Sequence, residues 1–332
     1  MEKSKFDFND IENQVKFERL SKEDVQKIFD EGGFASEGEI KKTEQELEFI
    51  KELDKYLNNE FKRLGILDFI NEERRECYAD EYGETHYKTP KTLIPLYKIQ
   101  LVEKISKMGV SGHCDDSGEI VIDAEKARSS FHKFCDIATH EILHSLSYIR
   151  YNSRFGYRTG ISDIEEKKKI VRQKYSYDYS EHFMGLTEAI TEKMTIEILN
   201  NISKQSKFPL KKEQSELLGH YSELIEVLNI IIEKVAKEND QNKNEIWENF
   251  KIGLFTGEMM YLRKVEKIFG KGSLRILAAL QGKDSWFDEE GWRDEELCQK
   301  AIKYFQADNK QERDKIALGI FRKKFLTKNN DL

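Results

Sequence analysis

The sequence contains very few residues that break helices. Only three of its 332 residues are proline, namely Pro90, Pro95 and Pro209. Proline interrupts a helix because it lacks a backbone N–H and because its ring clashes with the preceding turn. This scarcity predicts a mostly α-helical chain.

Cysteine is also scarce, and the four residues present lie far apart: Cys77, Cys114, Cys135 and Cys298. No Cys-x-x-Cys pair occurs, which excludes paired structural zinc knuckles. Scattered cysteines of this kind are typical of reduced thiols in a cytosol-like compartment.

Long apolar stretches are missing as well. No run of about eighteen apolar residues occurs, so we predict no membrane span. The opening stretch MEKSKFDFNDIENQ has no apolar segment of the kind that a secretory signal peptide needs. We therefore expect a cytoplasmic protein, although export as an effector or toxin by a route without such a peptide is also compatible with the sequence.

The chain has no excess of basic charge. Its net charge is −7, from 55 Lys and Arg against 62 Asp and Glu, and no long basic run occurs. Nucleic-acid-binding surfaces are strongly basic, so nucleic acid is not the expected partner. Charged residues make up 35% of the chain and are mixed in sign, which is typical of amphipathic helices with charged outer faces.

The pattern of residues divides the chain into three predicted regions. Residues 1–75 form a helical N-terminal region, with helices expected over 8–30 and 39–64. Residues 76–205 form a core region that mixes strand and helix, and residues 206–332 form a helical C-terminal subdomain. Helical spacing of apolar residues predicts further helices over 213–237, 244–255, 257–269, 273–281, 294–306 and 310–326.

The middle region mixes strand and helix. A short apolar strand is predicted over residues 119–123, followed by a helix over 128–149. Residues 150–184 are mixed in character, with several tyrosines among basic residues, and we expect one charged helical turn in the middle. A strong helix is predicted from Leu186 to Ile202. The expected fold class is therefore α+β, mostly α, with a small sheet.

The clearest sign of chemistry is the stretch ATHEILHSLS, in which two histidines stand four positions apart. Residues four apart on a helix differ by about 40° around its axis, so His140 and His144 can bind one metal ion. Ala138 and Ile142 fall on the opposite side and form a packing face. Glu141 lies on the flank, where it can hold a metal-bound water without binding the metal. This arrangement is typical of zinc metalloproteases.

The same motif also arises by chance on ordinary helices, so a third ligand decides the matter. A histidine six residues after His144 would complete a metzincin site, but Arg150 stands there. The other common variant takes a glutamate from a later helix, and Glu188 and Glu192 have the required spacing. Glu188 would bind zinc, and Glu192 would accept the outer N–H of a liganding histidine. Alternatively, the two glutamates are a solvated pair with no metal role. A third variant of the site would use His182 or an aspartate as the last ligand.

The two motifs together, THEILH and LTEAITE, resemble those of the gluzincin group of zinc metallopeptidases. The second motif is similar to the N-E-G-x-T-E helix of bacterial members, with Thr187 in place of the asparagine. The 44 positions from His144 to Glu188 exceed the separation in thermolysin-like enzymes and are similar to that in anthrax-lethal-factor-like peptidases. The resemblance covers about residues 119–200.

This resemblance implies a zincin-like catalytic core with one Zn²⁺ ion held by His140, His144 and Glu188. A small sheet would lie above the His140–His144 helix, with the 119–123 strand near its edge. An edge strand can pair with an extended peptide substrate. The Glu188 helix and the C-terminal helices would form the opposite wall of the cleft.

The expected reaction is hydrolysis of a peptide or protein substrate by a zinc metalloendopeptidase. Glu141 would act as the general base and pass the proton of the zinc-activated water to the leaving amine. Gluzincins commonly stabilise the oxyanion with a tyrosine or histidine, and the candidates are Tyr179, His182 and Tyr221, with a slight preference for Tyr221. Arg158 would bind either a substrate carbonyl or a structural carboxylate.

Three other hypotheses remain compatible with the sequence. The enzyme could be a specialised protease that cleaves one regulator or acts as a toxin. The chain could instead be a zinc-stabilised scaffold or pseudoprotease with a regulatory role, although the presence of Glu141 counts against this. The last hypothesis is an all-helical interaction protein without metal.

Overall fold

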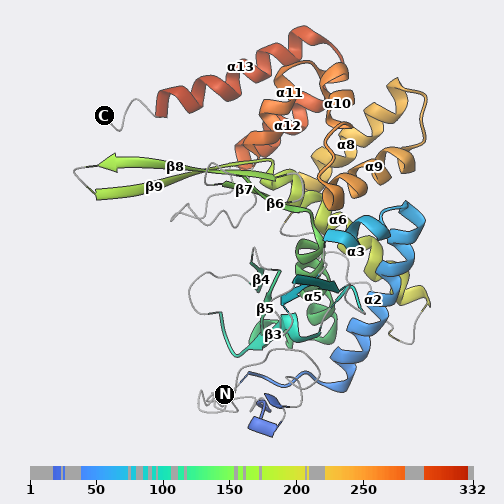
Figure 1. Ribbon diagram of the computed structural model, residues 1–332. Coiled ribbons are helices and arrows are strands. Elements are labelled where there is room, and N and C mark those ends of the chain that lie inside the picture. The colour runs from blue at the N-terminus through green and yellow to red at the C-terminus, as the bar shows by residue number, and fades with distance from the viewer. Residues whose placement is uncertain are drawn as a thin grey trace, which may run out of the picture.

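The computed structural model shows a mostly helical chain with small sheets (Figure 1). It describes residues 18–23, 25–26, 39–73, 76–79, 85–88, 92–94, 96–105, 111–115, 118–152, 156–159, 162–171, 174–205, 208, 221–280 and 295–327. The helices are α2 (Glu44–Leu64), α3 (Leu67–Glu73), η2 (a 3₁₀ turn, Leu96–Lys98), α4 (Ala124–Ala127), α5 (Phe131–Leu146), α6 (Met184–Gln205), α8 (Ser222–Glu238), α9 (Lys243–Thr256), α10 (Leu262–Phe269), α11 (Gly272–Ala279), α12 (Glu295–Gln306) and α13 (Lys310–Thr327). The strands are β1 (Glu76–Ala79), β2 (Thr85–Lys88), β3 (Ile99–Val102), β4 (Gly112–Cys114), β5 (Ile120–Asp123), β6 (Ile149–Asn152), β7 (Gly156–Thr159), β8 (Ser162–Val171) and β9 (Lys174–His182).

Most predicted helices are confirmed, with small shifts at their ends. The helix expected over 39–64 begins later, at Glu44, because Thr43 caps it and Ile40 instead forms a bridge with Arg19. The helix expected over 257–269 begins at Leu262, since Gly257 adopts a left-handed conformation and ends α9. Most of the 8–30 helix, and the start of the 213–237 helix, lie outside the described residues.

A three-stranded sheet covers the helix that carries the two site histidines. The strand order is β3-β5-β4, with β3 parallel and β4 antiparallel to β5, and α5 packs against β4 and β5. The 119–123 strand is confirmed as β5, but its expected place near the edge is wrong. It is the central strand, which fits its burial on both faces. The edge above α5 is β4, a strand too short and too glycine-rich to be recognised in the sequence.

The connection between the two site helices is a four-stranded antiparallel sheet, ordered β6-β7-β8-β9. The charged helical turn expected within 150–184 is therefore wrong, because its residues belong to β8. Strand β8 pairs along its length with β9, placing Lys167 opposite Asp178 and Lys168 opposite Tyr177. Pairing with a tyrosine-rich neighbour outweighs the low strand propensity of lysine and glutamate. Figure 1 shows the β8–β9 hairpin extending away from the helices.

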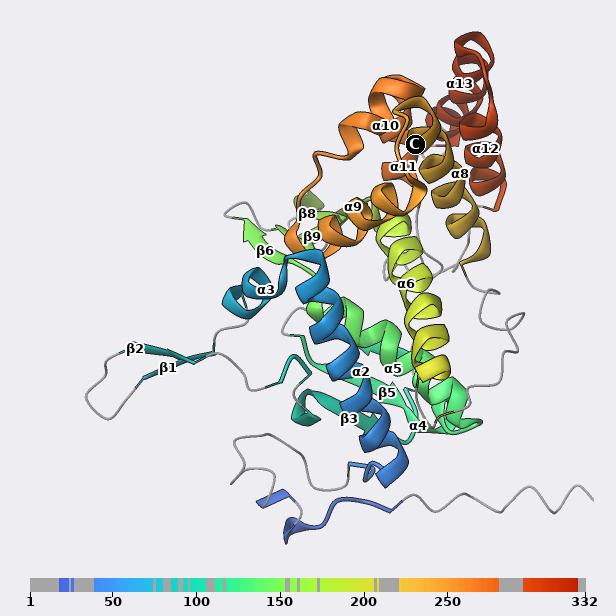
Figure 2. The same ribbon diagram turned by 90° about the vertical axis from the view of Figure 1, so that its right-hand side faces the viewer.

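Helices α2, α5 and α6 lie side by side in the centre of the molecule (Figure 2). Side chains from all three predicted regions, such as Leu53, Ile142 and Leu228, belong to one hydrophobic core. The predicted region boundaries fall beside segments outside the described residues, so they stay predictions. No helix in the described part of the chain is long and apolar enough to cross a membrane.

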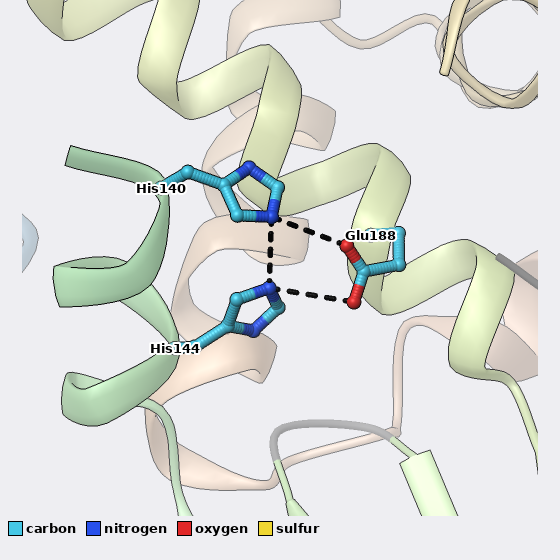
Figure 3. A group of neighbouring side chains, drawn as sticks. All are labelled: His140, His144 and Glu188. Atoms are coloured by element: carbon cyan, nitrogen blue, oxygen red, sulfur yellow. Dashed lines mark hydrogen bonds and ion pairs between the residues drawn. The ribbon is translucent and has the colours of Figure 1, made fainter. Parts of the chain in front are cut away.

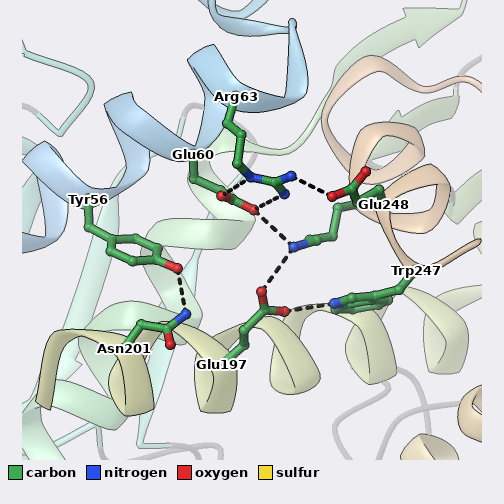
Figure 4. Close-up of polar contacts among 8 residues, drawn as sticks. Tyr56, Glu60, Arg63, Glu197, Asn201, Trp247 and Glu248 are labelled. Carbon is green, nitrogen blue, oxygen red and sulfur yellow. Dashed lines mark hydrogen bonds and ion pairs between the residues drawn. The ribbon is translucent and has the colours of Figure 1, made fainter. Parts of the chain in front are cut away.

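A group of charged side chains joins α2, α6 and α9 at the edge of this core (Figure 4). The Lys251 ammonium is only 2% exposed and donates to Glu60 at 2.9 Å and to Glu197 at 3.0 Å. Arg63 also donates to Glu60, and the Trp247 indole N–H donates to Glu197 at 2.7 Å. Buried charges persist only where they are paired in this way.

Because of this network, the stability of the folded state depends on pH. Hydrogen bonds from Arg63, opposed by burial and aided by Lys251, lower the pKa of Glu60 from its ordinary 4.5 to about 2. A lowered folded-state pKa adds stability above pH 4.5 that is lost as the pH falls towards 2.

We therefore expect Glu60→Gln to remove up to about 3 kcal/mol of stability near pH 6 and much less near pH 2. Urea unfolding of both proteins across this pH range measures the difference. Glu226→Gln, which changes an exposed carboxylate on α8, is the control and should show no such trend. A difference between wild type and Glu60→Gln that stays constant with pH would contradict the prediction.

Candidate metal centre

Two helices bring the predicted ligands together. The α5 helix begins after Ser130, whose side chain accepts from the Lys133 N–H, and carries His140 and His144 in its last two turns. The α6 helix packs against α5 and presents Glu188 in its second turn. Figure 3 shows the three side chains pointing toward one point between the helices.

The three side chains form a compact set of donors. The Nε2 atoms of His140 and His144 are 3.0 Å apart. One oxygen of Glu188 lies 3.2 Å from His140 Nε2, and the other lies 3.3 Å from His144 Nε2. The side chains are 13–19% exposed, so the site is mostly shielded from solvent. Within the described ranges, this is the group of His, Cys, Asp and Glu residues that could hold a metal ion.

The donor distances fit a tetrahedral metal ion. With bonds of about 2.0–2.1 Å, neighbouring donors of a tetrahedral zinc centre lie roughly 3.3 Å apart. The distances of 3.0, 3.2 and 3.3 Å among the three side chains are close to this value. Two imidazoles and one carboxylate would leave a fourth position open.

Glu192 orients the first histidine. Its carboxylate lies 2.9 Å from His140 Nδ1 and is one helical turn beyond Glu188 on α6. A carboxylate can only accept, so Nδ1–H is the donor and a neutral His140 ring has its lone pair on Nε2. That lone pair then faces the Glu188 carboxylate and the His144 ring. Three electron-rich groups converging on one point favour a positive charge between them, and these side chains could hold a metal ion.

The pKa values of His140 and Glu188 both shift in the direction that favours their charged forms. Burial lowers the pKa of His140, but hydrogen bonds to Glu188 and Glu192 outweigh it and raise the pKa well above its ordinary 6.5. Burial raises the pKa of Glu188, but attraction by His144 and His140 outweighs it and lowers the pKa well below 4.5.

Besides Glu141, Glu188 and Glu192, one more carboxylate lies near the site that was not predicted from the sequence. Asp136 stands one turn before His140 on α5, and its side chain is buried. Burial, aided by the nearby Glu192 and opposed by Lys133 and His140, raises the pKa of Asp136 to about 6. The i, i+4 spacing to His140 was visible in the sequence, but a single aspartate at that spacing carries little information.

Glu141 lies against the edge strand β4. A Cβ atom on Gly112 would come within 2.8 Å of Glu141 Cγ and 2.9 Å of its Oε1. The absence of a side chain at position 112 is therefore what leaves room for Glu141 beneath the sheet. The sequence held no sign of this contact, because it depends on how β4 crosses α5.

The three residues predicted as possible stabilisers of the oxyanion occupy different places. Tyr221, at the N-cap of α8, stacks on His140 with ring centroids 5.8 Å apart and planes 9° apart. Tyr179 lies on β9 opposite Glu166, and its side chain is outside the described part of the chain. His182 ends β9 with an exposed side chain and is not a member of the donor group.

Arg158 is placed only by its backbone. It lies on β7, opposite Arg150 of β6 and Asp163 of β8. Its side chain lies outside the description, so its expected role stays a prediction.

Comparison with known proteins gives no relative. No protein-family model, curated protein or solved structure matches the chain. The geometry of the site is therefore the basis for inferring a function.

We expect the three donors and Glu192 to differ in their effect on zinc affinity. Glu188→Ala removes one of three donors and should abolish tight zinc binding. Glu192→Gln keeps the donors but weakens the support of His140, so affinity should fall roughly 10- to 100-fold. Elemental analysis and competition with a chromogenic chelator measure both changes, and Glu226→Gln serves as the control. Unchanged zinc affinity in Glu188→Ala would exclude this site.

Proposed function

We propose that this protein is a zinc-dependent metalloendopeptidase of the gluzincin type, with a zincin-like catalytic core. The observation that carries the proposal is the triangle of donors from His140, His144 and Glu188, joined to Glu192 behind His140 and Glu141 beside it. A purely structural metal site would not need a glutamate directly after its first histidine ligand. The sheet lying over α5 adds support to the proposal.

Zinc, when bound, would acidify a water molecule and polarise the scissile carbonyl. Glu141 follows His140 by one residue, about 100° around the helix, so it lies beside the ligand set without joining it. In this position its carboxylate takes the proton of the attacking water and delivers it to the leaving nitrogen. Contact with Gly112 restricts the Glu141 side chain and keeps it ready for this transfer.

Other residues would bind the substrate and stabilise its oxyanion. The edge strand β4 offers backbone groups for pairing with an extended peptide, because none of the described strands pairs with its outer edge. Tyr221 stacks on His140, which places a phenol beside the ligand set. Its hydroxyl is our first choice for stabilising the oxyanion, ahead of Tyr179. The expected partners are a peptide or protein substrate, and the expected location is the cytoplasm.

The decisive experiment compares wild type with Glu141→Gln. The variant should keep its zinc and lose peptide hydrolysis by roughly 10²- to 10⁴-fold, because it lacks a base. Digestion of a quenched fluorescent peptide library, with and without chelator, measures activity, and elemental analysis measures zinc. Normal hydrolysis by the variant would refute the mechanism. A wild type that binds zinc but cleaves nothing would favour the zinc-stabilised scaffold.

Tyr221→Phe tests the oxyanion assignment. Phenylalanine keeps the ring stacked on His140 and removes only the hydroxyl. We expect kcat to fall roughly 10²-fold, with little change in KM or zinc content. An unchanged kcat would mean that another side chain stabilises the oxyanion, and Tyr179→Phe would be the next variant to measure.

A further inference from the structure

The four-stranded sheet β6-β7-β8-β9, which is inserted between α5 and α6, is called the inserted sheet below. It is anchored to the C-terminal helices at the point where α5 ends. The Tyr148 N–H donates to the carbonyl of Leu254 in α9, at 3.2 Å. The Tyr148 ring packs against Gly257, where a Cβ atom would lie 2.4 Å from the ring. Gly257 has a φ of +71°, a conformation that favours glycine. This contact is four residues beyond the ligand His144.

A second anchor lies where the sheet joins α6. The Phe183 N–H donates to Ala278 at 3.4 Å, and the Gly185 N–H donates to Leu280 at 3.0 Å. Gly185 lies so close to this segment that a Cβ atom would be 2.7 Å from the Leu280 carbonyl oxygen. Because this neighbour is backbone, it cannot move aside as a flexible side chain would.

This second anchor lies about one helical turn before Glu188, the proposed metal ligand on α6. Phe183 has a φ of +64°, a rare conformation for a residue other than glycine. Its carbonyl accepts the N–H groups of Leu186 and Thr187, which fixes the first turn of α6. Glu188 is the next residue along the chain. The path of the backbone at 183–185 therefore sets where the Glu188 carboxylate lies.

We propose that residues 254–257 and 278–280 form a two-point clamp that sets the spacing of the ligand helices, and that Gly185 is a positioning residue for Glu188. The clamp acts on the α5 exit through Tyr148 and on the α6 entry through Gly185. Metal ligands must lie within about 0.2 Å of their ideal distances, so small displacements of either helix weaken binding. This inference rests on the proposed zinc site but not on peptide hydrolysis.

The test measures zinc affinity in Gly185→Ala, using competition with a chromogenic chelator well below the unfolding temperature of the zinc-free proteins. The added methyl forces the backbone away from Leu280, and we expect binding to weaken roughly tenfold or more, as when the outer support of a ligand is lost. Gly319→Ala is the matched control, because a Cβ atom there meets nothing within 4 Å. Its zinc affinity should equal that of wild type.

A second pair of variants covers the case in which Gly185→Ala fails to fold. Phe183→Val and Phe183→Asn both remove the aromatic ring, but only valine is strongly disfavoured at positive φ. The valine variant should therefore bind zinc more weakly than the asparagine variant.

The outcomes separate this inference from the proposed function. A wild type that binds no zinc refutes the metal site itself. A wild type that binds zinc, with a folded Gly185→Ala of equal affinity, refutes the clamp alone. Equal affinities of the two Phe183 variants, both folded, also refute it. A lower unfolding temperature with unchanged zinc affinity would assign Gly185 a merely structural role.

Discussion

The structure depends on three electron-rich groups that face one another at the junction of two helices. Two imidazole nitrogens and a carboxylate lie 3.0–3.3 Å apart in a mostly shielded site. Three such donors could hold one metal ion, and Glu192 supports this by fixing the proton of His140 on the outer nitrogen.

The rest of the chain holds the two helices at a distance at which these donors could bind one metal ion. Helix α2 packs on both, and its charges connect to α6 and α9 through buried Lys251. The C-terminal helices contact the chain at both ends of the inserted sheet. The site is therefore a product of segments from all three regions, although its donors come from only two helices.

The helices and the grouping of His140, His144 and Glu188 could be predicted from the sequence because their signals are local. The spacing of His140 and His144, and of Glu188 and Glu192, places each pair on one face of its helix. Relations between distant segments could not be predicted. The charged residues of β8 carry no strand pattern, and their conformation depends on pairing with β9. The contact of Gly112 with Glu141 depends on how a three-residue strand crosses α5.

The connectivity of the inserted sheet has a consequence for how the protein can vary. Its first and last strands are each attached to a ligand helix, while β8 and β9 pair in register up to Val171 and Lys174 at the far end. Residues added in pairs at that end would lengthen both strands equally and leave the attached ends in place. The length of the outer hairpin can therefore change without altering the spacing of His140, His144 and Glu188.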